Sequence, residues 1–189
     1  LVIGTLAIVL IIYANTLLLL WTDDEELSAK IVPILRVLVV GNLFSAITRF
    51  ISQTAYAHGL TRLVLYFNIF AMVFIIPGLY VIIPHFGAIG AAYLWALYTG
   101  GALFLGCPLF FRNILIGESF RWYILDTALP LAVGILASLF FYFIVPQPTN
   151  WITQWGVIIL GAIITFVTIL LSMPLLRGVI LMRVKKLIT

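Results

Sequence analysis

Six apolar stretches, each long enough to cross a bilayer as a helix, follow one another along the chain. The hydrocarbon core of a bilayer is about 30 Å thick, which about 20 helical residues span. Hydrophobic residues make up 65% of the chain and charged residues 8%, whereas soluble domains have about 45–50% and about 25%. We therefore predict an all-α, polytopic membrane helix bundle with six transmembrane helices, at residues 2–21, 31–57, 63–83, 88–111, 122–145 and 152–176.

The charged residues predict how such a bundle is oriented. The connections alternate between the two sides of the membrane, and short connections make neighbouring helices antiparallel. One side carries the acidic segment 23–26 with Lys30 and, further on, His85. The other side carries most of the basic residues: Arg62, Arg112, Arg121, Arg177, Arg183, Lys185 and Lys186. Because basic residues favour the cytoplasmic side, we expect a multi-pass protein of the cell membrane (inner or plasma) with the acidic segment outside.

Sequence motifs of the common enzyme classes are missing from the chain. It contains no nucleotide-binding glycine loop, no H-E-x-x-H and no G-x-S-x-G, so we predict that it is not an enzyme and has no cofactor. The single cysteine, Cys107, excludes an intrachain disulfide and a cysteine metal cluster. His58 and His85 lie at connections on opposite sides and cannot form a metal site together.

The stretch 31–57 differs from the others because its polar residues share one side of a helix. They recur at alternating steps of three and four residues, which is the spacing of one helical stripe. The stripe consists of Asn42, Ser45, Arg49, Ser52 and Tyr56, with Gln53 beside it. A spanning helix with one polar face needs something other than lipid on that side. We therefore predict a polar cavity, and further candidates to face it are Tyr13, Asn15 and Thr16.

Arg49 is the most informative residue of the stripe. It precedes Gly59 by ten positions, or roughly 15 Å along a helix, which places it near the middle of the membrane. An arginine there costs at least about 2.5–3.5 kcal/mol, so it normally faces a cavity or a partner. One interpretation is that it binds an anionic group such as a phosphate. The other is structural: the side chain reaches the cytoplasmic interface or pairs with an acid. We predict a substrate-binding set of Arg49, Asn42, Ser45, Gln53 and Tyr56.

Small residues recur at every fourth position of the stretch 88–111. They form a smooth ridge that allows another helix to approach closely. The ridge consists of Ala88, Ala92, Ala96 and Gly100. We favour static helix packing as its role, and a sliding surface between moving helices is the second interpretation.

Two short motifs, in this order and at this spacing, resemble sequence segments of a family of membrane transporters. The first is Y-A-H-G-L-T-R at residues 56–62, followed six residues later by Asn68, and the second is G-A-I-G-A-A-Y-L-W at residues 87–95. They resemble the C-terminal lobe of the polysaccharide flippases and of the related multidrug-and-toxin-extrusion and lipid II flippase proteins. All are members of the multidrug/oligosaccharidyl-lipid/polysaccharide exporter superfamily. The resemblance covers about residues 1–112.

The resemblance implies a larger transporter, in which two similar lobes face each other across a cavity and work by alternating access. Residues 1–112 correspond to helices of the C-terminal lobe. Residues 113–189 look like the two additional helices of the fourteen-helix members, followed by a basic cytoplasmic tail. Since the chain begins with a leucine inside an apolar stretch, we interpret it as a C-terminal fragment of such a protein.

The resemblance also implies a function and a set of partners. The function is that of a flippase, which moves a lipid-diphosphate-linked oligosaccharide (O-antigen type) across the cytoplasmic membrane for polysaccharide biosynthesis. Its partners are then this lipid-linked oligosaccharide, the membrane lipids and, as candidates, the polysaccharide polymerase or glycosyltransferase machinery, with no nucleic acid.

Two alternative functions stay open. The first is a multidrug or cation antiporter of the same superfamily, which the lack of a carboxylate near the middle of the membrane disfavours. The second is a membrane assembly subunit that does not itself transport. An integral glycosyltransferase would need a polar loop with paired carboxylates, and the segment 23–26 is too short for such a site.

Overall fold

The computed structural model describes residues 1–108, 122–146 and 150–173, and these residues form helices and short connections with no strand. Contacts group the chain into two units. One consists of residues 22–119 and the other of residues 1–21 with 120–189. The predicted boundary at residue 112 rests on the family resemblance and stays a prediction.

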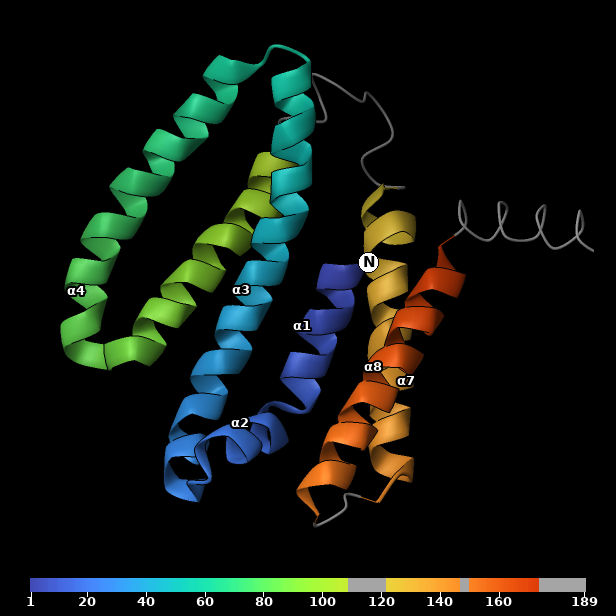
Figure 1. Cartoon of the computed structure of the whole chain (residues 1–189). Coiled ribbons are helices and arrows are strands. Elements are labelled where there is room, and N and C mark those ends of the chain that lie inside the picture. The colour runs from blue at the N-terminus through green and yellow to red at the C-terminus, as the bar shows by residue number, and fades with distance from the viewer. Residues whose placement is uncertain (109–121, 147–149, 174–189) are drawn as a thin grey trace, which may run out of the picture. The chain divides into compact units, whose positions relative to one another are not determined.

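The first unit is built from α3 (Glu25–Ala57), α4 (Thr61–Gly101) and the π-helical segment η1 (Ala102–Gly106). α4 folds back on itself, so that its second arm lies beside α3 (Figure 1). The fold-back occurs at Gly87, whose φ of 60° and ψ of −148° are not helical. Only glycine adopts this combination of φ and ψ without backbone strain. The first arm of α4 contains the predicted stretch 63–83, and the second arm, continued by η1, corresponds to the predicted stretch 88–111 as far as residue 108.

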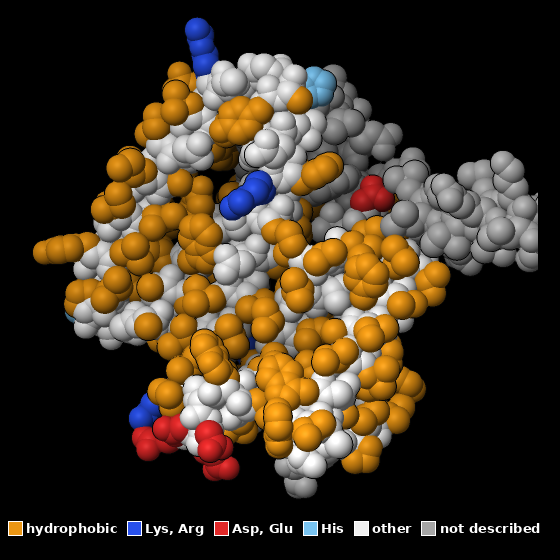
Figure 2. All heavy atoms as spheres, in the orientation of Figure 1, with side chains coloured by type: hydrophobic (Ala, Val, Ile, Leu, Met, Phe, Trp, Pro, Cys, Tyr) orange, Lys and Arg blue, Asp and Glu red, His pale blue; other side chains and the backbone are white. Residues whose placement is uncertain are grey.

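α3 begins at Glu25 and not at residue 31, because an N-cap starts it earlier. The Asp24 side chain accepts a hydrogen bond from the Leu27 amide at 3.0 Å, and Glu25 and Glu26 occupy the first turn. Both features stabilise the positive end of a helix. With 33 residues, α3 is roughly 50 Å long and extends beyond a hydrocarbon core of about 30 Å. We therefore expect its acidic end to extend into water. Figure 2 shows acidic side chains clustered on the surface.

The predicted ridge of small residues packs the second arm of α4 against α3. A Cβ added at Gly41 of α3 would lie 3.1 Å from the Ala96 Cα, and one at Gly100 would lie 3.4 Å from the Phe44 ring. Ala92 is buried, whereas Ala88 is exposed. The packing role is confirmed for the middle and end of the ridge. Gly41, which sequence reasoning missed, supplies the matching small residue on α3.

Pro77-Gly78 in the stretch 63–83 predicts a kink or an interruption of the helix, and the interruption does not occur. The helical backbone of α4 continues through both residues, and the only non-helical φ/ψ inside it is at Gly87. Instead, Gly78 allows the two arms of α4 to pack closely, because it has no side chain. A Cβ at this position would lie 2.7 Å from the Leu94 Cδ2. The glycine is therefore explained by close packing and not by a turn.

The second unit contains α1 (Val2–Ile12), most of α2 (Ala14–Thr22), η2 (Trp122–Ala128), α7 (Leu129–Ile144) and α8 (Trp151–Ser172). α7 and α8 form an antiparallel pair, and α1 packs on both (Figure 1). Glycines permit the close contacts. A Cβ at Gly134 would lie 2.6 Å from Ile169 and 3.0 Å from Ile8, and one at Gly161 would lie 2.9 Å from the Tyr13 hydroxyl.

The first predicted span, residues 2–21, is not a single straight helix. α1 and α2 meet at an angle of 75°. Neither glycine nor proline lies at the bend. Instead Tyr13, between the two helices, is fully buried and packs edge-on against Tyr142 with ring centroids 5.5 Å apart. The burial of this ring in the core of the unit accompanies the change of direction.

The described residues contain four helices that are long and apolar enough to span a membrane, or five if α1 and α2 count as one bent span. Six apolar segments are recovered when the two arms of α4 are counted separately. The prediction of an all-α membrane helix bundle is confirmed. The ends of the predicted stretches 88–111 and 152–176 lie outside the described residues, as do Arg112, Arg121, Arg177, Arg183, Lys185 and Lys186.

Candidate functional site

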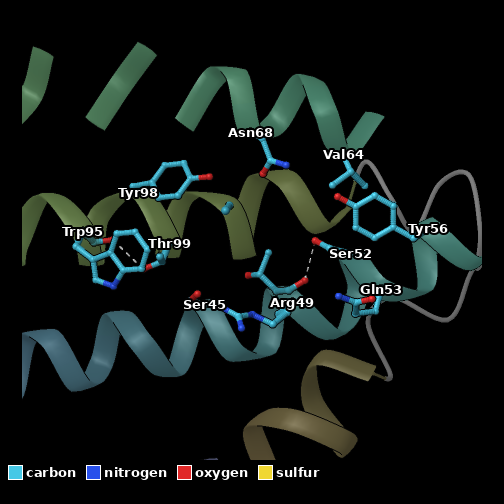
Figure 3. Close-up of a pocket in the computed structure, with 12 residues that line it drawn as sticks. Ser45, Arg49, Ser52, Gln53, Tyr56, Val64, Asn68, Trp95, Tyr98 and Thr99 are labelled. Carbon is cyan, nitrogen blue, oxygen red and sulfur yellow. Dashed lines mark hydrogen bonds between the residues drawn. The ribbon is translucent and has the colours of Figure 1, made fainter. Parts of the chain in front are cut away.

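A pocket of about 370 Å³ lies within the first unit, between α3 and the two arms of α4. Figure 3 shows its side chains facing a shared space, and Figure 2 shows a hollow in the surface with a basic side chain in it. Half of the lining residues come from α3 and half from α4 and η1. They are Ser45, Thr48, Arg49, Ser52, Gln53, Tyr56, Val64, Asn68, Trp95, Tyr98, Thr99 and Ala102.

Four of the five predicted substrate-binding residues line this pocket: Arg49, Ser45, Gln53 and Tyr56. The fifth, Asn42, is exposed and does not line it. The indole of Trp95 packs on Gly41 at this level of α3, with its Cδ1 only 2.7 Å from the place of a glycine Cβ. We attribute the end of the pocket before Asn42 to this contact. Whether the four residues bind a substrate stays a prediction.

The residues that α4 contributes were missed as site residues. Asn68 lies on the first arm, and Trp95, Tyr98 and Thr99 lie on the second. The spacing of the second set, continued by Ala102, is i, i+3, i+4 and i+7, which marks one helical face. That signal was present in the sequence. It does not tell which face meets α3, because this depends on the fold-back at Gly87.

Several hydroxyl groups of the pocket are already used by their own helices. Thr48 donates to the Phe44 carbonyl at 2.9 Å, Ser52 to the Thr48 carbonyl at 3.2 Å and Thr99 to the Trp95 carbonyl at 2.8 Å. This bonding satisfies the hydroxyl donors inside the helix. The guanidinium of Arg49 and the amides of Gln53 and Asn68 then supply strong donors that face the pocket.

Arg49 is the only charged side chain among the described lining residues, and none of these carries a carboxylate. Within the part of the chain that the structure describes, Arg49 has no ion pair or hydrogen bond. The ion pair found there joins Lys30 to Glu26 at 2.6 Å, near the acidic end of α3. The pocket therefore presents one fixed positive charge with neutral donors around it, and a group with negative charge fits that arrangement.

The polar residues of the first stretch do not join the site. Tyr13 is buried in the second unit, where its hydroxyl has no partner among the described residues. Asn15 is exposed and Thr16 is partly exposed, and neither lines the pocket. The expectation that Tyr13 faces the same cavity was wrong, because its ring fills the space between α1, α7 and α8.

Comparison with protein families gives one finding. Residues 1–81 match the sequence model of the family MatE. The match covers α1 to α3 and most of the first arm of α4, and thus Arg49 and Asn68, but not Trp95 or Tyr98. Neither the curated proteins nor the solved structures gave a match.

MatE is a family of membrane exporters in the multidrug/oligosaccharidyl-lipid/polysaccharide exporter superfamily, and its members are transporters and not enzymes. Residues 1–81 of this chain are similar to that family. With the apolar helices, this similarity indicates a multi-pass membrane protein. The match does not distinguish an oligosaccharide flippase from a multidrug exporter. That choice depends on the chemistry of the pocket.

Proposed function

We propose that the protein is part of a flippase for a lipid-diphosphate-linked oligosaccharide, and that the pocket between α3 and α4 holds the charged head group of this substrate. The observation that supports this best is the charge of the pocket. Arg49 is its only charged lining residue, and no carboxylate accompanies it among the described residues. A diphosphate carries negative charge and several acceptor oxygens, which an arginine fork and side-chain amides suit.

Energetics support a functional role for this arginine. A charge near the middle of a membrane is costly, and such residues face a cavity or a pathway. Arg49 fulfils this condition because it lines a pocket together with Gln53 and Asn68. An anionic substrate compensates the charge while it is bound. After release, water in the open cavity solvates the guanidinium, as alternating access requires on each side in turn.

A multidrug exporter is the second candidate function, and one observation favours it. The aromatic side chains Tyr56, Trp95 and Tyr98 line the pocket, and aromatic faces attract organic cations. Arg49 opposes this binding, since two positive charges in a pocket of about 370 Å³ repel each other. We therefore place the anionic substrate first.

The test is the export of finished polysaccharide by cells that lack their own flippase and carry the full-length protein. We expect Arg49→Ala to reduce surface polysaccharide at least tenfold while the protein level in the membrane stays near that of the parent. Arg49→Lys keeps part of the activity, because lysine retains the charge but not the two-oxygen contact. Arg36→Ala is the matched control: it removes an arginine from the same helix, and Arg36 does not line the pocket.

Normal export by Arg49→Ala would contradict the proposal and assign the arginine to the membrane interface. The same cells also separate the two candidates. If the parent protein restores no polysaccharide but raises resistance to organic cations, the multidrug function is correct and the flippase function is wrong.

A further inference from the structure

Trp95 and Tyr98 form an aromatic wall of the pocket. Their ring centroids lie 6.1 Å apart with an interplanar angle of 41°. Both side chains are half-buried and line the pocket. In Figure 3 Trp95 projects from the second arm of α4 toward α3, on the Ser45 side of the pocket, whereas Tyr98 projects toward the first arm with its hydroxyl in the direction of Asn68.

Each of the two rings packs against a neighbouring helix segment. A Cβ at Gly41 would lie 2.7 Å from the Trp95 Cδ1 and 3.1 Å from the Ala96 Cα, so the indole rests directly on the backbone of α3. The Tyr98 ring packs against Phe74 of the first arm, with centroids 6.5 Å apart. A ring fixed in this way loses little conformational entropy on binding, which favours affinity.

The pocket thus combines two kinds of surface from different helices. Arg49 of α3 offers a positive charge, and the Trp95–Tyr98 wall offers uncharged aromatic faces. The face of an aromatic ring is electronegative and attracts polarised C–H groups. One face of a sugar ring consists of C–H groups, while its hydroxyls project around the edge. A sugar directly attached to a phosphate presents both required features within one small group.

We propose that the Trp95–Tyr98 wall stacks against the first sugar ring of the substrate, the ring attached to the diphosphate, and that Gly41 positions Trp95 for this contact. The inference rests on the proposed function, because it assumes that Arg49 holds the diphosphate. It assigns a separate task to the second arm of α4. Arg49 recognises the charge that all lipid diphosphates share, whereas the aromatic wall distinguishes a glycosylated from a bare lipid diphosphate.

The experiment measures the affinity of purified full-length protein for two probes, a polyprenyl diphosphate without sugar and the same lipid carrying one hexose. We expect the parent to bind the hexose probe about threefold to tenfold more tightly, the range that an aromatic contact contributes. We expect Trp95→Leu to remove this preference, so that its affinities for the two probes become equal. Trp95→Phe keeps part of the preference, since phenylalanine retains an aromatic face. Arg49→Ala weakens the binding of both probes by the same factor.

Gly41→Ala tests the positioning role without a change in the wall itself. Its added methyl group displaces the indole, and we expect the preference for the hexose probe to fall as in Trp95→Leu. Gly101→Ala is the matched control, because a Cβ at Gly101 of α4 meets no atom within 4 Å. It should bind both probes like the parent.

The outcomes separate this inference from the function on which it rests. If Arg49 is needed for both probes but Trp95→Leu keeps the full preference for the hexose, the aromatic wall is not the sugar site, and the flippase function stands. If the parent shows no preference between the probes, the aromatic wall is likewise excluded as the sugar site. If neither probe binds in an Arg49-dependent manner, the proposed function fails and the inference fails with it. Weaker binding of tetraphenylphosphonium to Trp95→Leu, without a sugar preference in the parent, would assign the wall to organic cations.

Discussion

A single side chain gives the pocket its electrostatic character. Arg49 is the only charged lining residue among those described. Residues close to it in the sequence do not all face the pocket. Ser45, one turn earlier, lines the same pocket, whereas Phe50, the next residue, is 66% exposed and does not line it. The direction of the charge, and not only its depth in the membrane, therefore distinguishes a binding role from an interfacial one.

This distinction predicts which second-site arginine restores activity to Arg49→Ala. An added Ser45→Arg substitution brings the charge back into the pocket, and we expect it to recover about a tenth or more of parent export. An added Phe50→Arg substitution places the charge about 100° around the helix and recovers none. Surface polysaccharide in flippase-deleted cells is the measurement. Equal rescue by both variants would mean that the site needs only a positive charge at this depth, and the assignment of the pocket would be wrong.

At the scale of the elements, the hairpin of α4 and its contact with α3 create the pocket. The fold-back at Gly87 returns the second arm to α3, where Gly41, Ala96 and Gly100 allow the two backbones to approach. Between helices in a membrane, close approach gives the packing that holds them together. The same approach brings Trp95 to its place beside the pocket.

Ala92 tests this packing, and Ala88 provides its control within the ridge. Ala92 is 2% exposed, so Ala92→Leu places extra bulk between packed elements, which typically costs about 1–3 kcal/mol. We expect a lower level of folded protein and an earlier loss of monodispersity on heating in detergent. Ala88→Leu adds the same bulk at an exposed position and should behave like the parent. Unchanged heat stability of Ala92→Leu would show that the ridge does not pack there.

Much of the fold followed from hydropathy, because spanning length and apolar composition are local properties of the sequence. The α3 stripe was equally accessible, since one helix determines which residues share a face. Three features were not accessible in this way. The bend at Tyr13 depends on burial against Tyr142, the role of Gly78 depends on Leu94 from the other arm, and the loss of Asn42 from the site depends on Trp95. Each requires knowledge of which helices meet.

At the scale of the whole molecule, α3 fixes the orientation of its unit in the membrane. It is longer than the hydrocarbon core, with the acidic segment 23–26 at one end and Arg62 just beyond the other. The charge bias predicts that the Arg62 end is cytoplasmic. The pocket lies in the half of α3 nearer to that end, with Tyr56 next to last in the helix. The predicted orientation therefore places the pocket nearer to the cytoplasmic side, on which the proposed lipid-linked sugar would be loaded.

Cysteine labelling checks this orientation. In a cysteine-free background, in which Cys107, the single cysteine of these 189 residues, and any cysteine outside them are replaced, we expect Glu25→Cys to react with a membrane-impermeant maleimide in intact cells. His58→Cys, at the other end of α3, should react only after the cells are opened. Both positions are exposed in the structure, so accessibility within the protein does not limit either reaction. Labelling of His58→Cys and not Glu25→Cys in intact cells would reverse the orientation.

Photocrosslinking in living cells tests the central claim most directly, because it asks what occupies the pocket. The photoreactive amino acid p-benzoylphenylalanine replaces Tyr56, which lines the pocket and is 44% exposed. As a control it replaces Tyr66, which is 64% exposed on the first arm of α4 and does not line the pocket. We predict that irradiation attaches a glycan-bearing lipid to the protein at position 56 and not at position 66, and that Arg49→Ala abolishes the adduct. Adducts without glycan at position 56, or glycan adducts of equal yield at both positions, would contradict the assignment of the pocket to a lipid-linked oligosaccharide.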